Sequence, residues 1–133
     1  MVKTARSIAL KARQHRLHQA VARVVDDLPD AIQDLLEDVA IVVEDEPSPD
    51  HLVDAELDPD DELYGLYQGI PQTERSSSYS LVTPDRIIIF AGPLERSCAT
   101  RREFDEQIRI TLLHELGHHL GFDEGGLDTL GLS

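Results

Sequence analysis

Apolar residues recur at three- and four-residue spacings between residues 15 and 28, and this period predicts an amphipathic helix that begins near His15. The apolar face of this helix would consist of Leu17, Ala20, Val21, Val24, Val25 and Leu28. Pro29 ends the helix because proline has no amide proton to donate. Residues 1–14 show no sustained period and are rich in cations, so we expect a disordered basic arm before a single folded domain at residues 15–133.

Two continuous apolar runs predict the strands of a small sheet. Val39–Val43 and Arg86–Phe90 are rich in β-branched residues, a composition typical of buried strands. Two or three strands are expected in all. Proline and glycine residues stop regular structure after both runs, and Ala91-Gly92-Pro93 is expected to terminate the second one.

The residues between these two strands are predicted to form short elements and a loop. Asp30 is a suitable N-cap for a short helix over Ala31–Glu37. An acidic surface loop is expected at residues 47–59, followed by a short helical turn at Asp60–Leu66.

The last long element is predicted to be a helix from about Thr100 to Leu120. Thr100 followed three residues later by Glu103 matches a capping box, and Gly121 suits a helix C-terminus. One arc of this helix carries Leu112, Leu113, Leu116 and Leu120, which would hold it against the core. The order of elements therefore predicts an α+β fold, with helices packed on a small sheet.

Composition restricts the possible functions. The net charge of −14 argues against a nucleic-acid partner, because phosphate backbones are bound by surplus lysine and arginine. No stretch approaches the roughly 18 apolar residues of a membrane span, so no membrane partner is expected. Cys98 is the single cysteine, which agrees with a reducing compartment and a cytoplasmic location. Residues 44–62 hold ten acidic side chains and no lysine or arginine, and we interpret them as a solvated segment or a site for a basic partner.

The pentapeptide His114-Glu115-Leu116-Gly117-His118 lies within the predicted last helix and has the spacing of a zinc site. Residues four apart on a helix are separated by about 40° around its axis, so His114 and His118 project from one face. Two imidazole nitrogens suit Zn²⁺ and leave positions for a third protein ligand and a water. Glu115 would stay off the metal, take a proton from the zinc-bound water as it attacks a carbonyl, and deliver it to the leaving amine.

Two adjacent carboxylates after the helix, Asp123 and Glu124, are candidates for the third zinc ligand. Glu124 is favoured because it lies ten residues after His114, the spacing of the extended zincin pattern, with Asp123 or water as the alternative. His119 points about 100° away from His118. We expect it to support the ligands from outside the coordination sphere or to lie on the surface.

A group that stabilises the oxyanion is also expected. Tyr64, Tyr67, Arg75 and Tyr79 are candidates because each has a proton to donate. The strand predicted at Arg86–Phe90 would present an edge with which an extended peptide could pair.

Three segments resemble the bacterial minimal zincin-like metallopeptidase family: Leu66–Arg75, Pro84–Ile87 and His114–Gly121. The resemblance covers roughly residues 15–131. It implies a compact zincin-like domain with the active-site helix near the C-terminus. It further implies zinc bound by His114 and His118, Glu115 as the base, and an acidic third ligand after Gly121.

These observations favour a zinc-dependent hydrolase, a peptidase that acts on a peptide or protein. The alternative is a catalytically weak or inactive zincin-like module that binds metal and other proteins. A metal-dependent endoribonuclease also uses histidines four apart, but the similar ribonuclease motif has no glutamate at the position of Glu115. The charge of −14 argues against that class as well.

Overall fold

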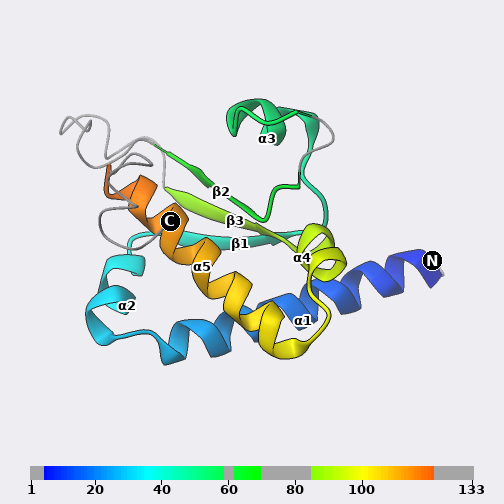
Figure 1. The fold of residues 1–133 in the computed structure, drawn as a ribbon, viewed down its shortest axis with the longest axis horizontal. Coiled ribbons are helices and arrows are strands. Elements are labelled where there is room, and N and C mark those ends of the chain that lie inside the picture. Colours follow the sequence, from blue (N-terminus) through cyan, green and yellow to red (C-terminus); the bar gives the residue numbers. More distant parts are fainter. Residues whose placement is uncertain (1–4, 59–61, 70–84, 122–133) are drawn as a thin grey trace.

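The structure, a computed structural model, describes residues 5–58, 62–69 and 85–121. These residues form a three-stranded sheet and five helices (Figure 1). The elements are α1 (Ala5–Asp27), α2 (Asp30–Leu36), β1 (Ala40–Glu44), α3 (Pro49–Asp54), β2 (Gly65–Gln68), β3 (Arg86–Phe90), α4 (Ala91–Ser97) and α5 (Arg101–His119). The expected α+β fold is confirmed. Among the helices of the described residues, none has the length and apolar character needed to cross a membrane.

Strand β3 is the centre of the sheet, whose order is β1-β3-β2. It pairs in parallel with β1, with Ala40 opposite Arg86, and antiparallel with β2, with Gly65 opposite Ile89. Residues 87–90 have no exposed surface, because β3 has a strand on each side and packing on both faces. Strand β1 was also predicted to be buried, but it is only partly buried because it lies at the edge of the sheet.

The two faces of the sheet pack against different layers. Ile87 and Ile89 point into the main core, which contains residues of α1 and α5. Ile88 and Phe90 point to the other face and contact a smaller cluster that includes Leu52 of α3. Figure 1 shows this arrangement, with α3 on one side of the sheet and α1 and α5 on the other. The continuous apolar sequence of β3 follows from this burial on both faces.

Helix α1 begins at Ala5, ten residues before the predicted start, so residues 5–14 are helical where a disordered arm was expected. These residues include alanine, leucine, lysine, arginine and glutamine, all of which favour helices without an apolar stripe. Arg13 also ties this part of α1 to the rest of the fold. Its guanidinium lies 2.6 Å from Asp45 Oδ1 and 2.9 Å from Glu95 Oε2, and both carboxylates raise its pKa.

Three local predictions between residues 29 and 66 are wrong. Pro29 occupies the N-cap position of α2, so Asp30 is the first helical residue instead of the cap. The expected loop contains α3, which begins with a capping box between Ser48 and His51. The expected helical turn at residues 60–66 overlaps β2, because Gly65 and Leu66 pair with the central strand.

Candidate metal centre

Helix α5 begins and ends at signals that the sequence contains. The Thr100 side chain accepts a hydrogen bond from the Glu103 amide at 3.1 Å. The Glu103 carboxylate accepts one from the Ala99 amide at 3.0 Å, one residue before the Thr100 amide that a capping box would use. At the other end, Gly121 has a φ of 95°, a left-handed conformation that glycine adopts without steric cost. The predicted limits of this helix are therefore confirmed to within a residue.

The apolar side of α5 holds it against the core. Ile108 and Leu112 are fully buried and Leu116 is 2% exposed, while Leu113 and Leu120 pack more loosely on the same cluster. This packing leaves His114 and His118 half-buried on another face of the helix. The core contacts thus fix which way the histidine side chains project.

His114 and His118 bring their Nε2 atoms to 3.2 Å from each other. A tetrahedral zinc ion with Zn–N bonds of about 2.0–2.1 Å keeps two ligand nitrogens about 3.3–3.4 Å apart. The two side chains therefore already have nearly the separation of ligands to one ion. Together with Glu115 they form a group whose potential ligand atoms lie within 4.8 Å of one another.

Glu115 is nearly buried, and its two carboxylate oxygens have different surroundings. Oε1 accepts a hydrogen bond from the backbone amide of Tyr67 in β2 at 2.9 Å. Oε2 lies 3.9 Å from Nε2 of His114. Helix α5 packs directly on β2, and this packing places the strand within reach of the carboxylate. The result is a carboxylate that is held by one oxygen and faces a histidine with the other.

His119 is fully buried. Its Nδ1 lies 2.7 Å from Oδ2 of Asp85, which is 3% exposed and immediately precedes β3. Of the two positions expected for His119, the surface is therefore excluded, and Asp85 is a partner that sequence reasoning did not single out. The sequence signal for Asp85 was its place in the Pro84–Ile87 segment that resembles the family, which assigned it no role.

Several other candidate residues lie outside the described part of the chain. These are Asp123 and Glu124, proposed as third ligands, and Arg75 and Tyr79, proposed as oxyanion stabilisers. Tyr64 and Tyr67 are half-buried and pack against the main core. The ring of Tyr67 stands edge-on to that of His119, with centroids 5.6 Å apart.

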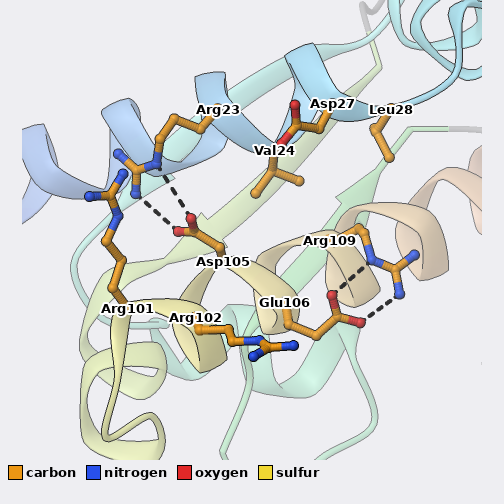
Figure 2. Close-up of a pocket in the computed structure, with 9 residues that line it drawn as sticks. All are labelled: Arg23, Val24, Asp27, Leu28, Arg101, Arg102, Asp105, Glu106 and Arg109. Atoms are coloured by element: carbon orange, nitrogen blue, oxygen red, sulfur yellow. Dashed lines mark hydrogen bonds and ion pairs between the residues drawn. The ribbon is translucent and has the colours of Figure 1, made fainter.

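A large groove between α1 and α5 lies away from the histidines (Figure 2). It measures about 970 Å³, and its α5 residues come from the first half of the helix, between Arg101 and Arg109. The lining residue of α5 nearest in sequence to the histidines is Arg109, five residues before His114, or about 7.5 Å along a helix at 1.5 Å per residue. Figure 2 shows Arg23 reaching across to Asp105, and the atoms of this pair approach to 3.0 Å. None of the residues that line this groove is His114, Glu115 or His118.

The sequence profile of the zincin-like metallopeptidase family matches residues 36–132. This range is most of the chain and includes β1–β3, α5 and the histidine pair. The chain belongs to this family. The resemblance noted from the sequence is confirmed, and among the described residues the cluster of His114, Glu115 and His118 could hold a metal ion.

A solved structure of a conserved hypothetical protein from T. thermophilus is similar to this zincin-like chain. The match has a TM-score of 0.53 and 19% sequence identity, and it covers 88% of this chain and 95% of the other. At this identity, the likeness concerns the fold alone. No curated protein matches the sequence significantly.

Proposed function

We propose that this protein is a zinc-dependent hydrolase that cleaves peptide bonds. The observation that carries the proposal is the pair of Nε2 atoms at 3.2 Å, with the Glu115 carboxylate held beside them. When bound, a zinc ion would act as a Lewis acid and make its water nucleophilic near neutral pH. His114 and His118 would hold the ion.

Glu115 serves as the general base in this proposal. One of its oxygens orients the carboxylate and the other transfers the proton. Oε1 is engaged by the Tyr67 amide, which fixes the orientation of the carboxylate. Oε2 faces His114 from 3.9 Å, so it is the oxygen that takes the proton from the attacking water and returns it to the leaving amine. A backbone amide suits this positioning task because its location is set by the pairing of β2 with β3.

An extended peptide substrate would lie along β2, not along the strand favoured from the sequence. Strand β3 is paired on both sides and has no edge to offer. The Phe90 amide donates to the Tyr64 carbonyl at 2.9 Å, and in an antiparallel ladder alternate residues bond to the same neighbour. The backbone groups of Gly65 and Tyr67 therefore face away from β3, toward the side where Glu115 lies. A substrate strand on this side would pair with Gly65 and with the Tyr67 carbonyl, since the Tyr67 amide is bonded to Glu115, and would pass close to the histidine pair.

Glu124 completes the proposed ligand set, with Asp123 as the alternative. Gly121 ends α5 in a left-handed conformation, before the position ten residues after His114. A hard carboxylate oxygen with two imidazole nitrogens is a donor set that zinc accepts.

The test combines zinc content with hydrolysis of a mixture of unstructured peptides. The wild-type protein should bind about one zinc ion and cleave peptide bonds. Glu115→Gln should keep the zinc and lose at least about 100-fold in rate, because the base is gone while the ligands remain. His118→Ala should lose the zinc, and added zinc should no longer raise its unfolding temperature.

Each outcome separates the enzyme from an interaction module. Zinc binding by the wild type without cleavage of any peptide would favour a metal-binding module that recognises other proteins. Full activity in Glu115→Gln would refute the assigned base.

For the third ligand, Glu124→Gln should weaken zinc binding more than Asp123→Asn, and the reverse order would transfer the role to Asp123.

A further inference from the structure

The last turn of α5 is joined to the start of β3 by a buried polar contact. His119 Nδ1 and Asp85 Oδ2 lie 2.7 Å apart, and the side chains are 1% and 2% exposed. Removing two such polar groups from water is costly unless they interact with each other. The contact is a short approach between two specific atoms, so it ties the position of His119 to that of Asp85.

Two further residues close around the Asp85 carboxylate. Gly69, which follows β2, has a φ of 152°, and a Cβ at this position would overlap the carboxylate oxygen of Asp85. The same Cβ would lie 2.8 Å from the hydroxyl oxygen of Tyr67. The end of β2, the start of β3 and the end of α5 therefore meet at Asp85, and only a residue without a side chain fits at Gly69.

This meeting point is connected to the candidate metal centre through two residues, His118 and Tyr67. His119 directly follows His118, and both belong to the last turn of α5, where helices tend to fray. Tyr67, whose ring packs on His119, donates its amide to Glu115. A shift of His119 would therefore be passed on to a proposed ligand through the helix and to the proposed base through β2.

We propose that Asp85 and His119 are positioning residues that hold His118 and Glu115 in the arrangement needed to bind and use the metal. This inference rests on the proposed function for its metal. The buried pair, which lies outside the ligand set, sets the positions of His118 and Glu115. Leu116 and the other apolar contacts of α5 supply stability. The pair acts without touching the ion.

The first test measures zinc affinity by competition with a chromophoric chelator in Asp85→Asn and His119→Gln. Both changes keep the approximate size of the side chain. Each should weaken zinc binding about tenfold, the lower end of the range for residues that support metal ligands from outside the coordination sphere. The double variant should bind no more weakly than the poorer single variant, because both changes break the same contact.

Ile108→Val provides a matched control. Ile108 is fully buried on the same helix, but it lies ten residues before His118. Its truncation should lower the unfolding midpoint to a similar degree and leave zinc affinity unchanged. Equal loss of affinity in this control would show that Asp85 and His119 act through general stability, and would overturn the proposal.

The second test uses metal-free protein, so it remains informative if the wild type binds no zinc. Hydrogen exchange of the Tyr67 amide reports its bond to Glu115. In Asp85→Asn, this amide should exchange at least about fivefold faster than in the wild type, relative to the amide of Leu66, which bonds within the sheet. Failure of zinc binding in the wild type would refute the proposed function, and unchanged Tyr67 exchange in both variants would refute the positioning role.

Discussion

The two halves of α5 are stabilised in different ways. Residues 101–110 are largely exposed or half-buried apart from Ile108, which is in the core. Much of their other support is local: the Thr100 cap, the Glu103 carboxylate on the Ala99 amide, and an ion pair between Glu106 and Arg109 at 2.6 Å. One contact to a distant element, between Arg23 and Asp105, is also an ion pair in which both side chains are about one third exposed.

The second half of the helix depends on residues far away in the sequence. Its buried members are Thr111, Leu112, Glu115, Leu116, Gly117 and His119. Glu115 bonds to a residue 48 positions earlier, and His119 contacts Asp85 near the start of β3. The candidate metal centre thus lies in the half that contacts the sheet. Local signals make the first half helical, whereas contacts with distant residues orient the second half.

The largest loss of stability is expected from Leu112→Ala, in the second half of α5. Leu112 is fully buried in the core between the two layers, so its truncation leaves a cavity as well as removing apolar contacts. The free energy of unfolding should fall by about 2–5 kcal/mol, measured by urea denaturation of the metal-free protein. Arg102→Ala in the exposed first half is the control and should change it by less than about 0.5 kcal/mol. Similar losses in the two variants would show that the halves are not supported differently.

A smaller effect is expected from Thr100→Ala. This change removes the hydrogen-bond acceptor for the Glu103 amide and should cost about 1 kcal/mol. Thr100→Ser should restore most of the stability, because serine offers the same hydroxyl oxygen. Hydrogen exchange should show faster opening of residues 101–104, while the Tyr67 amide stays as protected as in the wild type. A loss of protection at Tyr67 would mean that the two halves of α5 are coupled more tightly than their contacts indicate.

The sequence predicted both ends of α5 well because their signals are local. Thr100, Glu103 and Gly121 act within a few residues, and their spacing indicates where the helix begins and ends. The histidine pair was also predictable, since the helical period alone brings His114 and His118 to one face. Neither the Tyr67 amide nor Asp85 could be predicted in the same way. Both depend on strand pairing and on packing between elements that are distant along the chain.

The strands show the same limit. The runs at β1 and β3 look alike in the sequence, yet one lies at the edge of the sheet and the other at the centre. Strand β2 contains Gly65 and Gln68 and was missed, because its place is set by pairing with β3 and by contact with α5. Gly65 is needed for that contact: a Cβ there would lie 3.1 Å from the Ile88 carbonyl oxygen and 2.5 Å from the Thr111 side chain. Fold class followed from composition and period, whereas the position of the edge strand did not.

The smallest effect concerns the pKa of Glu106 in the exposed first half. The hydrogen bond from Arg109 is the main cause that lowers this pKa, and the charges of Arg109 and Arg102 add to it. In Arg109→Gln, carbon-13 NMR titration should therefore show the pKa of Glu106 rising toward the ordinary value of a glutamate. Arg102→Gln should raise it less, because only a charge at a distance is removed.

The direction of the shift also fixes the pH dependence. A pKa that is depressed in the folded state stabilises the fold above the unfolded-state pKa. This contribution is lost as the pH falls through the folded-state pKa. Because the pair is exposed, 1 M salt should weaken the shift. A pKa of Glu106 that is unaffected by Arg109→Gln would show that the local ion pair does not support the first half of α5, and the contrast between the halves would then rest on the Thr100 cap.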